Sequence, residues 1–126
     1  MKKNDLLKCN ICKNVVELVH IGEGTLTCCN KNMQPLETNF PEANNAHFAQ
    51  VETLDNNQKR VYFNHEMTPD HHIEFIELFS KNEKYITRKY LREDETPEIF
   101  LRCYYEEGFI ARLYCNRDGV WQTEID

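Results

Sequence analysis

Four cysteines near the N-terminus constrain this chain more than any other feature. Cys9 and Cys12 form a C-x-x-C pair, Cys28 and Cys29 are adjacent, and a short strand-like segment separates the pairs. Two such pairs can bring four thiolates to one metal ion, and a tetrahedral sulfur site selects zinc or iron. Two disulfides are the alternative, but C-x-x-C in a chain without a secretion signal usually indicates metal or redox chemistry. The adjacent pair departs from ordinary zinc ribbons.

The segment that carries this cluster, residues 1–36, is shorter than chains that usually fold unaided. A unit below about 40 residues generally needs a metal, disulfides or oligomerisation. A structural zinc ion contributes about 10–16 kcal/mol at neutral pH, so we expect the cluster to stabilise this module. His20 lies between the cysteine pairs. Because four thiolates complete a tetrahedral site, we expect His20 to be a partly exposed strand residue.

Composition and charge exclude several classes of protein. The formal net charge of -6 argues against a general nucleic-acid binder, which should present a basic patch. No apolar run approaches the roughly 18 residues of a membrane span. The first residues, MKKNDLLKCN, lack the apolar core of a signal peptide. We therefore expect a cytoplasmic protein whose cysteines are metal ligands or free thiols.

The rest of the chain reads as a linker and an all-β unit. Residues 37–46 are polar, with one proline and two adjacent asparagines, and are predicted to be a linker. The second unit is predicted to span residues 47–126. β-branched and aromatic content favours a strand over a helix at 73–79, and Glu106-Glu-Gly is a hairpin signal. About seven short strands predict a β-sandwich. The strands expected along the chain are 15–19, 47–54, 59–63, 73–79, 85–91, 99–105, 109–114 and 120–125.

A second group of metal-binding residue types lies in this unit. Four of the five histidines, at positions 47, 65, 71 and 72, fall here, and Cys115 lies near the C-terminus. Histidine and cysteine are the usual ligands of late transition metals. Scattered histidines are mostly surface or core residues, so spacing alone leaves the metal site as one of two interpretations.

Three stretches carry a resemblance to a known family. KCNICKNVVELVHIGEGTLTCCNKNM resembles the desulforedoxin-type module at the front of desulfoferrodoxins, the two-iron superoxide reductases. HEMTPDHHIEFIEL is similar to their HPMTPEHYIEWIEL-type stretch, and ARLYCNRDGVW to their ARAYCNLHGLW-type stretch. The resemblance spans the whole chain, in order. It implies a desulforedoxin-like module followed by an immunoglobulin-like β-sandwich.

The resemblance also implies two iron sites. Cys9, Cys12, Cys28 and Cys29 would hold the first iron, with zinc as the alternative metal. His47, His65 and His71 would be equatorial ligands of the second iron, and Cys115 its axial thiolate. These four residues would form the catalytic site, with an open position for superoxide. His72 matches a position that is commonly aromatic in the family, and Cys103 has no ligand counterpart, so a buried free thiol is expected there.

Two departures from the family pattern alter the second site. The family's fourth histidine, three residues after the axial cysteine, is Asp118 here, and its Glu-Lys pair before the first histidine is Asn45-Ala46. We hypothesise that Asp118 is a ligand, since its carboxylate oxygen is as many bonds from the backbone as the nearer ring nitrogen of a histidine. Lys81, Lys84 or Arg117 could replace the missing lysine charge, although most such residues are simply solvated.

The implied activity is reduction of superoxide to hydrogen peroxide without production of dioxygen. An electron donor such as a rubredoxin would restore the ferrous state, and a homodimer is implied by the family. Two alternatives remain open. One is an iron electron-transfer or redox-sensing protein with an altered second site, and the other is a structural zinc protein whose β-sandwich binds partners.

Overall fold

The described residues of this chain are extended rather than α-helical. The computed structural model describes residues 1–55, 58–102 and 108–126, and the chain divides into two compact units, Met1–Glu37 and Thr38–Asp126. Within those ranges there is no helix long and apolar enough to cross a membrane. The all-β class expected from the sequence is therefore confirmed.

The first unit is a small β-module with a minimal core. A three-stranded antiparallel sheet has β1 at its centre, and a short hairpin carries the adjacent cysteines. Leu7 is fully buried and packs with Cys9 and Met33, so one cysteine of the cluster is itself a core residue. The strands are β1 (Leu6–Lys8), β2 (Val15–Glu17), β3 (Thr27–Cys28), β4 (Lys31–Asn32) and β5 (Gln34–Pro35).

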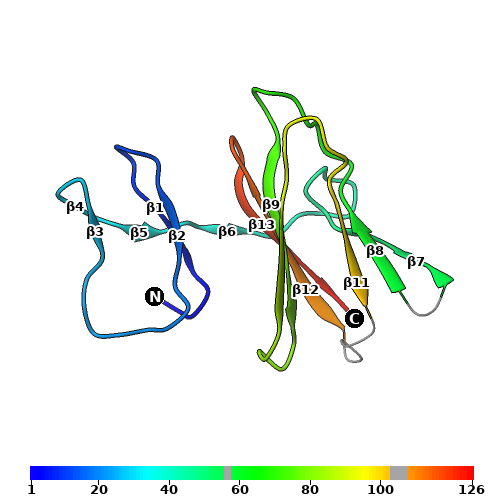
Figure 1. Cartoon of the computed structure of the whole chain (residues 1–126), viewed down its shortest axis with the longest axis horizontal. Coiled ribbons are helices and arrows are strands. Elements are labelled where there is room, and N and C mark those ends of the chain that lie inside the picture. The colour runs from blue at the N-terminus through cyan, green and yellow to red at the C-terminus, as the bar shows by residue number, and fades with distance from the viewer. Residues whose placement is uncertain (56–57, 103–107) are drawn as a thin grey trace. The chain divides into compact units, whose positions relative to one another are not determined.

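The second unit consists of two sheets (Figure 1). The five-stranded sheet has the order β10-β9-β12-β13-β6, and the three-stranded sheet has the order β11-β8-β7. The strands are β6 (Thr38–Asn39), β7 (Gln50–Thr53), β8 (Gln58–Tyr62), β9 (Ile73–Ser80), β10 (Ile86–Tyr90), β11 (Glu98–Arg102), β12 (Phe109–Cys115) and β13 (Gly119–Ile125). Among the strands of the described ranges, only β6 pairs in parallel, with β13.

Apolar side chains from both sheets meet in one core, which makes the unit a β-sandwich. Alternation along β9 sends Ile76 and Leu78 inward, where they pack with Val61 of the other sheet. A register shift follows, because Tyr114 pairs with Phe75 and the next residue, Cys115, pairs with Ile73. Such a bulge re-aims side chains, and it lies where β9 and β12 reach the histidines and cysteine described below.

The outer face of the five-stranded sheet carries a buried charge cluster. Glu77 lies opposite Arg88 on β10 and Arg112 on β12. Its two carboxylate oxygens accept hydrogen bonds from both guanidinium groups, at 2.6–3.0 Å. Glu77 is fully buried, and Arg112 also stacks over Phe79. The cluster therefore ties three neighbouring strands together.

The sequence misplaced three features of this unit. Part of the expected linker is β6, which pairs with β13, so the unit begins at Thr38 rather than His47. His47 precedes β7 in a turn instead of lying on a strand. The expected hairpin between 99–105 and 109–114 is wrong, because β11 pairs with β8 in the other sheet while β9 and β13 already flank β12. Residues 103–107, including Cys103, lie outside the described ranges.

Candidate metal centres

The first centre is the cysteine cluster of the N-terminal unit. The sulfur atoms of Cys9, Cys12, Cys28 and Cys29 all lie within 4.8 Å of one another. Cys12 Sγ is 3.5 Å from Cys28 Sγ, and no disulfide links them, since these cysteines are free. Cys29 and Asn30 have positive φ angles of 51° and 61°, a turn that brings the adjacent cysteines to the same point. Four thiols that converge in this way can hold a metal ion in a tetrahedral sulfur site.

Backbone amides favour the thiolate form of Cys9, one of the four cysteines. Hydrogen bonds from the amides of Cys12 and Ile11 lower the pKa of Cys9 to about 6. The Cys28 thiol hydrogen-bonds with the Cys12 and Cys9 sulfurs, which raises its pKa to about 12. The Cys9 thiol therefore loses its proton readily, whereas neighbouring thiols help Cys28 to keep its proton. A bound cation would stabilise the thiolate form of all four cysteines together.

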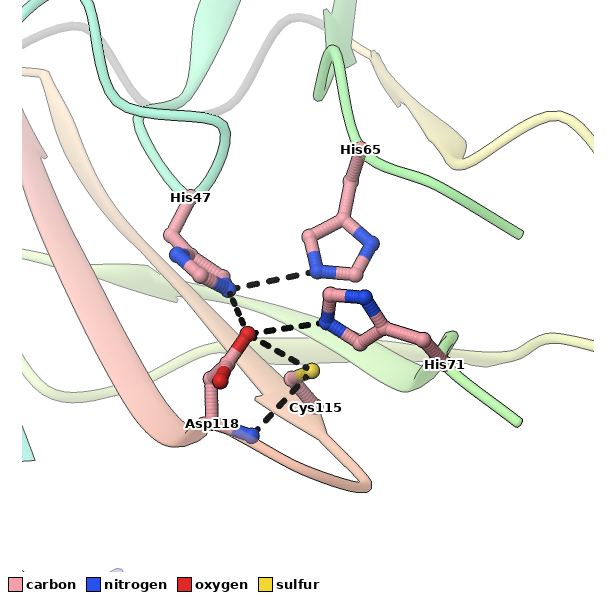
Figure 2. Close-up of side chains that lie close together, drawn as sticks. All are labelled: His47, His65, His71, Cys115 and Asp118. Atoms are coloured by element: carbon pink, nitrogen blue, oxygen red, sulfur yellow. Dashed lines mark hydrogen bonds and ion pairs between the residues drawn. The ribbon is translucent and has the colours of Figure 1, made fainter. Parts of the chain in front are cut away.

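The second centre lies beside strand ends of the second unit, and Figure 2 shows its side chains pointing toward one another. One ligand atom from each of five residues lies within 4.8 Å of the others, and the residues are His47, His65, His71, Cys115 and Asp118. His47 precedes β7, His65 follows β8, and His71 precedes β9. Cys115 ends β12, and Asp118 lies in the turn to β13. The structure thus brings together residues that are up to 71 positions apart in the sequence.

Hydrogen bonds on the outer side of His47 determine which nitrogen points inward. Asn45 Oδ1 accepts the backbone N–H of His47 at 2.8 Å and lies 2.8 Å from its Nδ1. Because the atom that accepts a backbone N–H is the amide oxygen, Nδ1 must be the donor. The neutral ring of His47 therefore directs the lone pair of Nε2 into the centre.

His65 is held in the same way by its neighbour. Its Nδ1 lies 2.6 Å from the backbone carbonyl of Glu66, which can only accept. Its Nε2 faces His47 Nε2 at 3.2 Å. Two lone pairs then face one another with no proton available between them, an arrangement that a bound cation satisfies. Burial lowers the pKa of both histidines, which keeps them neutral.

His71 lies between two carboxylates. Its Nδ1 is 3.0 Å from Glu66 Oε2, and its Nε2 is 2.8 Å from Asp118 Oδ2. The outer carboxylate accepts the Nδ1 proton, so Nε2 is again the inward nitrogen. All three rings therefore satisfy the pattern in which a ligand histidine donates its other N–H to a fixed acceptor.

Asp118 Oδ2 occupies the middle of the group. It lies 3.1 Å from His47 Nε2 and 3.7 Å from Cys115 Sγ, in addition to its contact with His71. Burial raises the pKa of this carboxyl, but its hydrogen bond with His71 and its electrostatic interactions with the neighbouring imidazoles outweigh that effect, so the net shift of the pKa is downward. Asp118 therefore places an anionic oxygen beside two nitrogen donors and one sulfur donor.

The turn between β12 and β13 fixes Cys115 and Asp118 together. Cys115 pairs with Gly119, whose φ of 80° closes the short loop. The backbone N–H of Asp118 donates to Cys115 Sγ at 3.4 Å. Burial raises the pKa of the Cys115 thiol, which is 1% exposed, and a nearby cation would favour its thiolate form.

Trp121 supports the centre from β13. Its indole stacks on His47, with ring centroids 4.4 Å apart and planes 8° apart. Its Nε1 donates to the backbone carbonyl of Asp118 at 2.8 Å. The one tryptophan of the chain thus contacts two of the five residues, and its fluorescence can report on them.

Other residues considered from the sequence lie elsewhere. His72 hydrogen-bonds through Nδ1 to the carbonyl of Thr68 at 2.9 Å and is not one of the five. Lys81 pairs with Asp126 at 2.6 Å and Glu124 at 3.4 Å, so its charge is already engaged. Sequence reasoning missed the acceptors Asn45 and Glu66 and the stacking residue Trp121, because their roles depend on side-chain orientation.

The donor sets fit iron at both places. Four sulfurs suit a tetrahedral iron or zinc ion. Three imidazole nitrogens, one thiolate and one carboxylate suit a late transition metal with mixed ligands. The strongest structural indication of a metal site is that the Nε2 lone pairs of His47 and His65 face one another at 3.2 Å, since both rings carry their protons on Nδ1. Fold and sites together define an all-β protein with two candidate metal centres.

Comparisons with known proteins agree with that class. Residues 1–36 match the N-terminal domain of desulfoferrodoxin, and residues 39–124 match the desulfoferrodoxin family. The desulfoferrodoxin of Nitratidesulfovibrio vulgaris is 32% identical over 123 residues, covering 95% of each chain. The desulfoferrodoxin homolog of Methanothermobacter thermautotrophicus is 31% identical over 121 residues, covering 94% of this chain and 96% of the relative.

Solved structures show the same fold. The superoxide reductase of Treponema pallidum has a TM-score of 0.69 at 19% identity and covers 94% of this chain and 96% of its own. The one-iron superoxide reductase of Giardia intestinalis has a TM-score of 0.53 at 21% identity and covers 64% of this chain and 97% of its own. The chain belongs to the desulfoferrodoxin family.

Proposed function

We propose that this protein reduces superoxide to hydrogen peroxide at an iron ion held by His47, His65, His71, Cys115 and Asp118. The observation that carries the proposal is the convergence of five ligand atoms within 4.8 Å, with all three Nδ1 atoms hydrogen-bonded outward. Membership of the desulfoferrodoxin family supports the same activity.

The ligand residues would tune and orient the iron in distinct ways. When bound, ferrous iron supplies the single electron that superoxide needs to become peroxide. The histidine rings, fixed by their outer hydrogen bonds, hold their Nε2 atoms in place without reorganisation. Cys115 adds a buried thiolate that donates electron density, and Asp118 adds a second anionic donor. Two protons from solvent complete hydrogen peroxide, since the overall reaction consumes one electron and two protons per superoxide.

Charge around the site predicts a slower enzyme than the family pattern implies. Ala46 is exposed and supplies no cation where the family pattern has lysine. Focusing of a charged substrate contributes about 10- to 1000-fold to an association rate. Asp118 further reduces the positive charge that would attract the anion. The same two departures favour the second candidate function, an iron electron-transfer or redox-sensing protein that no longer turns over superoxide.

The N-terminal unit would hold the other iron through Cys9, Cys12, Cys28 and Cys29, with zinc as the alternative. Because Cys9 belongs to the small core of that unit, the metal would be part of its folded structure. An iron there could pass electrons from a donor of the rubredoxin type. The cytoplasmic location and the homodimer remain predictions from the sequence and the family resemblance.

Stopped-flow mixing of the anaerobically reduced protein with superoxide tests the activity. We expect the second iron to be oxidised at a rate proportional to the superoxide concentration. One hydrogen peroxide should form per superoxide consumed, and no dioxygen should be released. The Ala46→Lys variant should react with superoxide faster at low ionic strength, with a rate constant higher by about 10- to 1000-fold. No superoxide-dependent oxidation in either protein would leave electron transfer as the function.

A further inference from the structure

Glu66 contacts two of the three ligand histidines at once. Its backbone carbonyl lies 2.6 Å from His65 Nδ1, and its carboxylate Oε2 lies 3.0 Å from His71 Nδ1. The side chain itself is 54% exposed and is not among the five converging residues. In the family stretch to which this segment is similar, the corresponding residue is proline, which has no carboxylate. The contact with His71 is therefore a feature of this chain.

The loop from Glu66 to His71 holds the carboxylate toward the ring. Thr68 N–H donates to the carbonyl of His71 at 2.9 Å, and His71 N–H donates to the carbonyl of Thr68 at 3.2 Å. The Thr68 hydroxyl lies 3.2 Å from the His71 carbonyl and 3.4 Å from Glu66 Oε2, so its single proton is shared between these two acceptors. The backbone bonds close the loop. Glu66 Oε2, the oxygen that faces His71 Nδ1, thus has the Thr68 hydroxyl as a second donor.

We propose that Glu66 is a positioning residue for the second iron, which fixes the orientation of His71 and makes its inward nitrogen a stronger donor. A carboxylate on the outer N–H of a ligand histidine raises the basicity of the ring, and loss of such a partner typically costs about 10- to 100-fold in metal affinity. The inference rests on the proposed function, because it assumes that the five residues bind iron.

Glu66 and Asp118 act on the same ring from opposite sides. The outer carboxylate increases the electron density of the imidazole, and the inner one would add an anionic ligand beside it. Both effects stabilise ferric over ferrous iron and lower the reduction potential of the centre. Glu66 therefore adds a second acidic contribution to the one that Asp118 brings in place of histidine.

Variants of Glu66 in the full-length protein test this role. Glu66→Gln keeps an acceptor of the same shape without the charge, and Glu66→Ala removes both, while the backbone carbonyl that holds His65 remains in each. Ferrous iron is titrated anaerobically into protein whose cysteine centre is already loaded, and Trp121 emission is followed. We expect affinity to fall in the order wild type, Gln, Ala, by about 10- to 100-fold at the end of the series, and the reduction potential to rise.

Two comparisons separate positioning from a general effect on stability. Glu74 is similarly exposed, at 44%, and lies 4.0 Å from His72 outside the site, so Glu74→Gln and Glu74→Ala should leave affinity and potential unchanged. In a His71→Ala background, Glu66→Ala should have no further effect on affinity. Unchanged affinity and potential in the Glu66 variants, or an equal loss without His71, would overturn the role of Glu66 alone. Failure of the wild-type protein to bind iron at this site would instead overturn the proposed function.

Discussion

Asp118 determines the charge of the second centre. A ferrous ion with one thiolate has a formal charge of plus one, and a carboxylate ligand brings the site to neutrality. Its Oδ2 contacts a nitrogen of His47, a nitrogen of His71 and the Cys115 sulfur. A ligand in that position would act on a bound metal directly, so Asp118 is the most informative residue of the second centre to substitute.

The Asp118→His variant should raise the reduction potential of the second iron. Replacing an anionic oxygen by a neutral nitrogen removes the preference for the ferric state that the carboxylate provides. A spectroelectrochemical titration of the second centre measures the change. The Glu93→His variant, at an exposed position outside the five-residue group, serves as the control. A potential that stays the same or falls would count against direct ligation by Asp118.

Single residues also mark the limit of sequence reasoning about the site. The five converging side chains could all be proposed from residue type and family resemblance. The role of Asn45 could not be proposed in this way. In the sequence Asn45 is notable only because the family pattern has glutamate at that position, whereas in the structure its amide oxygen orients His47. Hydrogen-bond partners of this kind depend on backbone turns and rotamers, which no spacing rule encodes.

At the scale of elements, the sheets position the ligands by bringing strand ends together. The five residues lie beside the ends of β7, β8, β9, β12 and β13. Alternating patterns predicted most of these strands. The pairing of these strands was harder to predict, because β11 and β12 belong to different sheets, and a local turn signal does not distinguish that arrangement from a hairpin.

The Glu77 cluster should be the most sensitive electrostatic feature of the sandwich. Glu77→Gln leaves the buried guanidinium of Arg112 without its carboxylate, and breaking a buried pair in this way costs about 3–5 kcal/mol. Denaturant unfolding of the metal-loaded protein measures the loss. Glu98→Gln, which disrupts the more exposed contact with Arg60, should cost about 0–1 kcal/mol. Equal losses in the two variants would show that burial of Glu77 does not strengthen its contribution.

At the scale of the whole molecule, two differently built units each carry one centre. The N-terminal unit has a core of three buried residues that includes Cys9 of the cysteine cluster, whereas the sandwich has an extensive apolar core of its own. The sequence predicted this difference from the length of the first segment. It could not place the start of the second unit, since the pairing of β6 with β13 joins residues about eighty positions apart.

Metal content of the native protein, compared with single-ligand variants, tests the central claim most directly. We expect about two irons per chain in the native protein, and about one in both Cys115→Ser and Cys9→Ser, each variant retaining the spectrum of the other centre. That result would mean that the second site binds iron with aspartate in place of the fourth histidine. Equal metal content in the native protein and Cys115→Ser would contradict the account, because only the cysteine cluster would then be loaded.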